Sequence, residues 1–153
     1  MGKKRIIQKD EKELIAEREK VDKNIAKGAV SSSASSSRNL GKGRVYVNAT
    51  YNNTIISLTD SMGNVLFWKS AGSIGFKGTK KGTSFASSQV AQAIVQAARQ
   101  FRIQQVEVYL KGIGGGRDSA LKTIVNQGIE VEAIKDVTPV PHNGCRPKKP
   151  RRV

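Results

Sequence analysis

The sequence is poor in cysteine, histidine and long apolar runs. Cys145 is the single cysteine among 153 residues, so the chain cannot form an internal disulfide and a disulfide-stapled secreted fold is excluded. One cysteine and one histidine also supply too few ligands for a structural zinc site. No apolar run approaches the roughly 18 residues of a membrane span, and residues 1–27 contain no apolar segment typical of a secretory signal. We therefore expect a soluble, cytoplasmic protein.

Acidic residues are scarce as well. The chain has 27 Lys and Arg against 12 Asp and Glu, which gives a formal net charge of +15. The first 24 residues hold 8 basic and 6 acidic residues, unlike the acid-poor transit peptides of organelles. The remaining 129 residues carry a net charge of +13. A field of this strength attracts polyanions, and nucleic acid is the partner class that it predicts.

Composition divides the chain into three parts. Residues 1–40 have weak helical periodicity and a serine-rich run, which predicts a charged, flexible N-terminal extension with a linker. Residues 41–138 alternate strand and helix patterns and predict one α/β domain. Residues 139–153 contain all four prolines and no acid, so we expect an extended basic tail.

Five strands are predicted where apolar and polar side chains alternate. Asn52 and Asn53 lie between the first two strands and are expected to form a hairpin turn, because asparagine tolerates positive φ. The order β-β-β-α-β-α-β predicts a five-stranded mixed sheet, an antiparallel meander first and parallel crossovers later. The predicted strands are 44–50, 54–60, 65–69, 106–110 and 129–137.

Two helices are predicted between the later strands. The first follows a cap at Thr83 or Ser84, and the second ends at Gly128, a residue typical of the position after a helix. Two glycine-rich segments, 70–82 and 112–116, are expected to form a loop and a tight turn. The apolar stripes are Val90, Ile94, Ala97 and Phe101 in the first helix and Leu121, Ile124 and Val125 in the second.

Basic residues gather in the 70–82 loop and in the tail. Glycines between lysines let backbone N–H groups approach a polyanion, and prolines hold the tail extended along a phosphate ribbon. Arg117 follows the 112–116 turn, where a helix N-terminus offers N–H groups to a phosphate. The glycine spacing of the 112–116 turn matches neither nucleotide-binding signature. Tight packing of small residues explains the turn equally well as a contact with an RNA phosphate.

Residues for catalysis are few and scattered. His142 has no acidic neighbour to orient it, and Cys145 has a basic neighbour but no base. Asp60, Asp118 and Asp136 would be the carboxylates of a metal-dependent nuclease, the alternative function. Each lies at the end of a predicted element, where it opens a turn, starts a helix or closes a strand, so the structural interpretation is favoured. We expect no enzymatic activity, no cofactor and no metal.

Three segments resemble one protein family. Residues 45–55 (VYVNATYNNTI), 71–81 (AGSIGFKGTKK) and 136–147 (DVTPVPHNGCRP) are similar to the opening hairpin, glycine-lysine loop and ending of the bacterial S-eleven family of small-subunit ribosomal proteins. The resemblance implies a ribonuclease H-like fold and a structural role on the rRNA of the small-subunit platform, beside the cleft that holds the Shine–Dalgarno duplex and mRNA. It further implies neighbours from the S-eighteen and S-seven families, and no enzymatic activity.

The basic segments and the family motifs together give a set of candidate rRNA ligands. Within this set, Asn143 precedes Gly144. Because glycine has no side chain, the Gly144 amide nitrogen is unhindered and can attack the Asn143 carbonyl, so succinimide and isoaspartate formation is expected. The residues predicted to bind rRNA are Lys42, Arg44, Asn52, Asn53, Lys77, Lys80, Lys81, Arg117, His142, Asn143, Arg146, Lys148, Lys149, Arg151 and Arg152.

Overall fold

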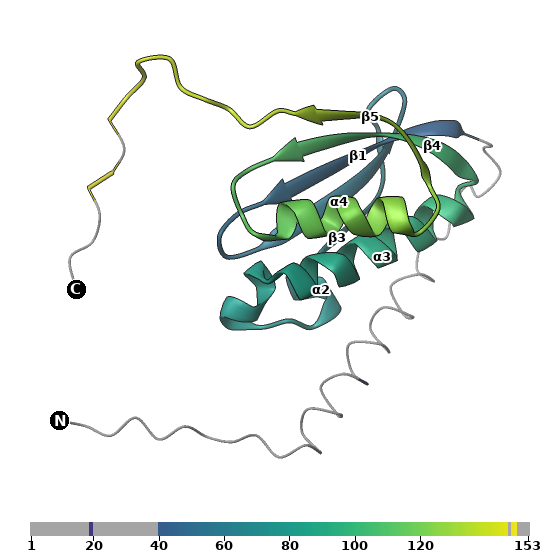
Figure 1. The fold of residues 1–153 in the computed structure, drawn as a ribbon, viewed down its shortest axis with the longest axis horizontal. Helices are drawn as coiled ribbons and strands as arrows, with labels where there is room; N and C mark the ends of the chain where they lie inside the picture. Colours follow the sequence, from purple (N-terminus) through teal and green to yellow (C-terminus); the bar gives the residue numbers. More distant parts are fainter. Residues whose placement is uncertain (1–18, 20–39, 147, 150–153) are drawn as a thin grey trace.

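The structure is a computed structural model that describes Glu19, residues 40–146 and residues 148–149. The predictions for the rest of the N-terminal extension, and those for Arg151 and Arg152, lie outside the described residues. Figure 1 shows a sheet with its helices packed on one side. The elements are β1 (Gly41–Ala49), β2 (Thr54–Asp60), β3 (Val65–Ser70), α2 (Ala71–Ile74), the 3-10 helix η1 (Gly78–Gly82), α3 (Ser84–Gln100), β4 (Ile103–Lys111), α4 (Gly116–Asn126) and β5 (Glu130–Asp136).

The sheet is mixed, as the sequence predicts. Its strand order is β3-β2-β1-β4-β5. β1 pairs antiparallel with β2, and β2 with β3, whereas the pairs β1–β4 and β4–β5 are parallel. The chain reaches β4 and β5 through α3 and α4, which supply the crossovers that parallel strands need. The predicted α/β class and five-stranded mixed sheet are confirmed.

The hydrophobic core lies between one face of the sheet and the helices. Along β1, Val45, Val47 and Ala49 are at most 1% exposed, while the residues between them are half-buried or exposed. Val90 and Ile94 of the predicted α3 stripe are buried against this face. Because the described helices all pack on that side, the other face of the sheet remains open in the described part of the chain (Figure 1). No helix among the described residues is both long and apolar enough to span a membrane.

The segment 70–82 is not a simple loop, contrary to the prediction. The Ser73 N–H donates to Ser70 Oγ at 3.2 Å and the Ser70 N–H donates to Ser73 Oγ at 3.0 Å, a reciprocal cap that begins α2. Gly75 ends this helix at φ 119°, and η1 begins three residues later. Helices of one turn contain too few residues for an apolar period to be detected, so the sequence pattern misses both.

The β1–β2 turn forms where predicted, but by a different mechanism. The Thr50 N–H donates to the Asn53 carbonyl at 2.9 Å, and the Asn53 N–H donates to Thr50 Oγ1 at 3.2 Å. The expectation of positive φ at Asn52 or Asn53 is wrong, since Arg102 and Asn143 are the only non-glycine residues with positive φ in the described part of the chain. The threonine hydroxyl closes the turn, so no left-handed residue is required.

Other element ends differ from prediction in informative ways. β4 begins at Ile103, three residues early, because Gln104 and Gln105 hide the start of its alternation. Val125, expected on the buried stripe of α4, is 49% exposed, since this short helix buries Ala120 and Ile124 instead. The end of α4 is correctly predicted, with Gly128 at φ 81°.

Candidate nucleic-acid interface

Three segments that are distant in sequence meet at one end of the sheet. The Gly114 N–H donates to the Ala49 carbonyl at 3.0 Å, which joins the turn after β4 to the turn after β1. The Ser84 hydroxyl donates to the Gly115 carbonyl at 3.1 Å and ties the start of α3 to the same turn. We call residues 50–53, 71–84 and 112–117 the turn end. In Figure 1 it lies on the left, where β1 and β4 end and α3 and α4 begin.

The glycines of the turn end are required by packing. A Cβ on Gly112 or Gly114 would overlap the backbone carbonyl of Ala49 or Thr50, and a Cβ on Gly82 would overlap that of Tyr51. Backbone therefore contacts backbone at these positions, and only glycine leaves the necessary space. This geometry supports the packing interpretation of the 112–116 turn, and its contact with an RNA phosphate stays a prediction.

The loop lysines lie in and directly before the short helix η1 at the turn end. Lys77 precedes η1, and Lys80 and Lys81 belong to it. Phe76 and Phe85 anchor this segment against the start of α3 in an edge-to-face contact, with 6.0 Å between ring centroids. Residues 61–106 contain six Lys and Arg and not one acidic residue. The segment thus carries positive charge without any acid of its own.

The basic tail leaves the sheet at the same end. After β5, the described residues 137–146 and 148–149 form neither helix nor strand, and Figure 1 shows them running away from the sheet. His142, Asn143, Arg146, Lys148 and Lys149 are all exposed. The turn end and the tail therefore bring together most of the predicted rRNA ligands on one side of the molecule.

Arg117 is held by contacts within the protein. Its Nη2 lies 2.7 Å from Asp136 Oδ2, and its Nη1 donates to the Gly112 carbonyl at 3.4 Å. Asp136 also accepts from the hydroxyl and N–H of Thr138, and these bonds, followed by the Arg117 guanidinium, lower the pKa of Asp136. We call Gly112, Arg117, Asp136 and Thr138 the tail clamp.

Lys42 and Arg44 lie apart from the other predicted ligands. They belong to the first half of β1 on the open sheet face, and Arg44 is five residues before Ala49, about 17 Å along a strand. Lys42 Nζ lies 3.1 Å from Glu132, and Arg44 Nε lies 3.3 Å from Glu107. Their charges are therefore compensated within the sheet.

Glu107 is the centre of a polar network on this open face. It accepts a hydrogen bond from the Tyr109 hydroxyl at 2.9 Å and lies 3.5 Å from Lys135 Nζ. The Tyr109 hydroxyl is the largest cause that lowers the pKa of Glu107, and Lys135 and Arg44 add to it. Tyr109 also stacks on Tyr46, with ring centroids 4.8 Å apart. The open face is thus aromatic and charge-paired, in contrast to the turn end.

The three candidate nuclease aspartates have separate structural roles. Asp60 Oδ1 accepts from the N–H groups of Met62 and Asn64 at 2.8 and 2.9 Å, which opens the β2–β3 turn as predicted. Asp118 lies in the first turn of α4, and Asp136 ends β5, also as predicted. Among the described residues, no group of three His, Cys, Asp or Glu could hold a metal ion.

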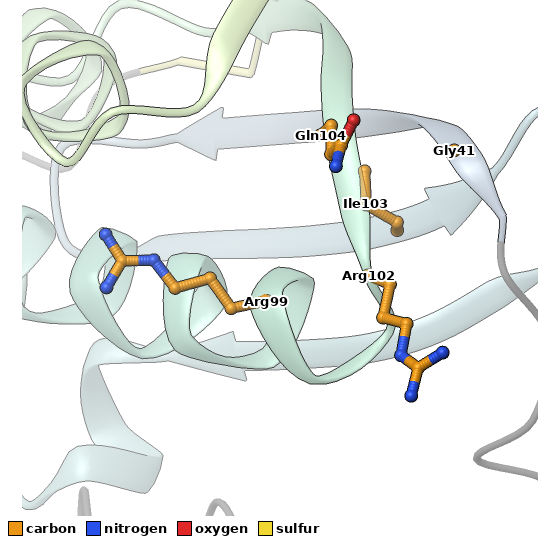
Figure 2. Close-up of a pocket in the computed structure, with 5 residues that line it drawn as sticks. All are labelled: Gly41, Arg99, Arg102, Ile103 and Gln104. Carbon is orange, nitrogen blue, oxygen red and sulfur yellow. The ribbon is translucent and has the colours of Figure 1, made fainter.

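A pocket of about 630 Å³ lies at the opposite end from the turn end, and its arginines are absent from the predicted ligands. Arg99 donates to the Gln127 carbonyl at 2.6 Å. Figure 2 shows its guanidinium and that of Arg102 pointing in different directions, so they do not converge on one anion. The lining residues are Gly41, Arg99, Arg102, Ile103 and Gln104.

Comparison with known proteins gives the family. The family described as Ribosomal protein S11 matches residues 43–152. The small ribosomal subunit protein uS11 of Borreliella burgdorferi is 50% identical over 128 residues, which are 84% of this chain and 98% of that protein. For the proteins of that name in Treponema pallidum and Nautilia profundicola, the identities are 49% over 125 residues (82% of this chain, 99% of the relative) and 48% over 130 residues (84% and 100%). The chain therefore belongs to the ribosomal protein S11 family, and it is a structural protein of the ribosome.

Proposed function

We propose that this protein is a structural constituent of the small ribosomal subunit that binds small-subunit rRNA with segments 50–53 and 71–84 of its turn end and with its basic tail. It works in translation, in ribosomes of the cytoplasm, and carries out no reaction of its own. The uS11 relatives, about half identical over most of the chain, support the subunit assignment. The site residues follow from the charge distribution.

The uneven compensation of charge carries this proposal. Lys42, Arg44 and Arg117 have carboxylate partners at 3.1, 3.3 and 2.7 Å. In contrast, the stretches 61–106 and 137–153 contain no acid at all. Polyanion binding depends on a local excess of positive over negative charge, because each cation placed on a phosphate displaces a counterion from the RNA. The loop and the tail are therefore the segments that bind the phosphates.

The fold suits a role as scaffold. The strand order β3-β2-β1-β4-β5, with β2 antiparallel to its neighbours, supports a ribonuclease H-like fold. Asp60, Asp118 and Asp136 are each engaged in a turn, a helix start or an ion pair, so no observation favours a nuclease. The domain holds the loop and the tail at one end, and these two segments bridge separate rRNA helices on the platform.

Protein neighbours and mRNA complete the proposal. Members of the S-eighteen and S-seven families adjoin the protein on the platform, and mRNA passes nearby beside the Shine–Dalgarno duplex. The charge-paired, aromatic face around Tyr46 and Tyr109 suits protein contacts better than RNA contacts, since interfaces between proteins are rich in aromatics and poor in unpaired charge.

The test is a salt titration of rRNA binding by filter retention. A variant that lacks residues 146–153 loses five cations but none of the strands and helices of the described residues, so circular dichroism should be unchanged. Its affinity for small-subunit rRNA should fall steeply at low salt, and the slope of log K against log salt should decrease by up to about four, at roughly 0.7–0.9 per phosphate.

A matched variant compares the loop with the tail. Replacing Lys80 and Lys81 with Gln removes two cations and should decrease the slope by at most about two. A folded, truncated protein that keeps both affinity and slope would contradict the proposed role of the tail. Unchanged binding in both variants would contradict the whole proposed interface.

A further inference from the structure

The tail clamp lies at the point where the basic tail begins. The Val137 N–H donates to the Leu110 carbonyl at 2.8 Å, and among the described residues this is the last backbone hydrogen bond between this segment and β4. Thr138 Oγ1 then accepts from the Gly112 N–H at 3.1 Å and donates to Asp136 Oδ1 at 2.6 Å. Gly112 belongs to the turn end, so these contacts join the first residues of the tail to the proposed RNA surface.

The Arg117–Asp136 ion pair closes the clamp from the side of α4. Its 2.7 Å separation and the 48% exposure of the Asp136 side chain distinguish it from the other ion pair of Arg117, with Asp118. That second pair is 4.0 Å long, and the Asp118 side chain is 82% exposed. A long pair at such exposure contributes little, because solvent screens it. Asp136 is thus the main ion-pair partner of Arg117, and it also accepts two hydrogen bonds from Thr138.

We propose that Arg117 and Asp136 are positioning residues, which fix the direction in which the tail leaves the sheet rather than contact the RNA. The proposal rests on the proposed function, in which the tail binds rRNA. With the clamp closed, the tail leaves the sheet in one direction from the end that also carries the loop lysines. With the clamp open, the tail pivots about Val137 and must be ordered when RNA binds.

The cost of an open clamp is conformational. Ordering the backbone of one freed residue upon binding lowers an equilibrium constant by about tenfold. The bound state keeps the same cations on the same phosphates, so the number of counterions released is unchanged. An open clamp should therefore weaken binding by a similar factor at every salt concentration and leave the salt slope as it was.

A purely electrostatic role for these residues predicts the opposite sign. Asp136→Asn removes a negative charge and frees the Arg117 guanidinium, which would tighten RNA binding and steepen the slope by up to about one. The amide oxygen of the new side chain still accepts from Thr138, so the substitution opens mainly the ion pair. Asp118→Asn is a matched control, because it changes the net charge equally beside the same arginine and leaves the clamp closed.

The experiment measures retention of full-length small-subunit rRNA by the full-length protein across a salt series. We expect Asp136→Asn to weaken binding by about three- to tenfold at every salt concentration, with an unchanged slope, and Asp118→Asn to bind at least as tightly as the wild type. An Asp136→Asn protein that binds as tightly as the wild type, or more tightly, would overturn the proposal.

Two further variants keep the test independent of charge and of folding defects. Thr138→Val changes no charge but removes the hydroxyl that joins Gly112 to Asp136, so it should also weaken binding with an unchanged slope. Asp136→Glu restores the carboxylate and should recover part of the affinity. Equal affinity of Thr138→Val and the wild type would overturn the clamp.

The variant that lacks residues 146–153, measured in the same titration, separates the two proposals. If the truncation reduces affinity and slope while Asp136→Asn does not weaken binding, the clamp is wrong and the proposed function stands. If the truncation changes neither, the tail does not bind rRNA, and the proposed function fails in that part.

Discussion

The buried hydroxyls of Thr54 and Ser87 lie 2.8 Å apart directly against Gly116. Both residues are 0% exposed, so this hydrogen bond links β2 to α3 inside the core. A Cβ on Gly116 would overlap Ser87 Oγ and come within 2.6 Å of Thr54 Oγ1. The first residue of α4 is therefore glycine because two polar atoms of the core occupy the space of a side chain.

Gly116→Ala should destabilise the protein by about 2–3 kcal/mol. The added methyl group forces either the hydroxyl pair apart or α4 away from the core, and each adds overpacking to the loss of a buried hydrogen bond. The measurement is the free energy of unfolding from urea denaturation, followed by circular dichroism.

The neighbouring glycine offers the control for this substitution. A Cβ on Gly115 would meet nothing within 4 Å, and its φ of −62° suits any residue. Gly115→Ala should therefore be neutral or stabilise by up to about 1 kcal/mol. Equal destabilisation by both substitutions would show that the contact with Thr54 and Ser87 is not the cause.

Arg102 has the backbone conformation of a glycine. It follows the end of α3 with a φ of 55°, and its N–H donates to the Arg99 carbonyl at 3.1 Å. Side chains other than those of glycine and asparagine are unfavourable in this left-handed position. Arg102→Gly should stabilise the protein by about 0.5–1 kcal/mol in thermal or urea unfolding. Arg102→Ala removes the charge but keeps the strain, so a similar gain from it would contradict this explanation.

The fold was predictable from the sequence because β1, β2 and α3 follow simple periods. Val45, Val47 and Ala49 alternate, and Val90 and Ile94 follow the helical period, so burial of one face determines both elements. The helices α2 and η1 are too short to show an apolar period. The reciprocal cap of Ser70 and Ser73 marks the start of α2, and η1 has no side-chain cap. The S/T-x-x pattern of that cap is common in loops and predicts little without structure.

The candidate site was predictable in composition but not in geometry. Glycine-spaced lysines and an acid-free run of cations are visible in the sequence, and they indicate the loop and the tail. The partners of Lys42, Arg44 and Arg117 are 90, 63 and 19 residues away in sequence, on β4 and β5. Pairs of this kind depend on strand register, which sequence patterns do not give to single-residue accuracy. The sequence therefore predicts the same role for Lys42, Arg44 and Arg117 as for the cations of the loop and the tail, whereas the fold pairs these three with carboxylates.

Stability should decrease in acid, since three carboxyls have pKa values below their ordinary range. Hydrogen bonds lower them: from the Asn64 side chain to Asp60, from the Tyr109 hydroxyl to Glu107, and from Thr138 to Asp136. Each of these carboxyls has a lower pKa in the folded protein than in the unfolded chain, so its ionised form stabilises the fold. This stabilisation is complete above the pKa of the unfolded chain, about 4, and is lost as the pH falls through the pKa of the folded protein.

We therefore expect the urea midpoint to be constant from about pH 7 to 5.5 and to fall below about pH 4.5. Asp60→Asn keeps an acceptor for the Met62 and Asn64 N–H groups but cannot titrate, so its acid limb should be shallower. An acid limb equally steep in this variant and in the wild type would contradict a role for Asp60.

Trp68, the single tryptophan, should remain accessible when rRNA binds. It is 58% exposed and lies opposite Ser57, which in turn lies opposite Tyr46, so it belongs to the open face of the sheet. The cations Lys42 and Arg44 on this face are paired with glutamates, and RNA gains little by covering it.

Acrylamide quenching of Trp68 should therefore be the same with and without small-subunit rRNA. A second reporter provides the contrast: in a Trp68→Phe background, Phe85→Trp places the fluorophore at the start of α3, where Phe85 is 59% exposed directly after the last segment of the turn end. There, stacking on bases and the approach of phosphates should quench the emission and protect the ring from acrylamide. If rRNA protected Trp68 as strongly as it protects the second reporter, RNA would cover the open face as well. The paired charges of β1, β4 and β5 would then not keep RNA away from this face.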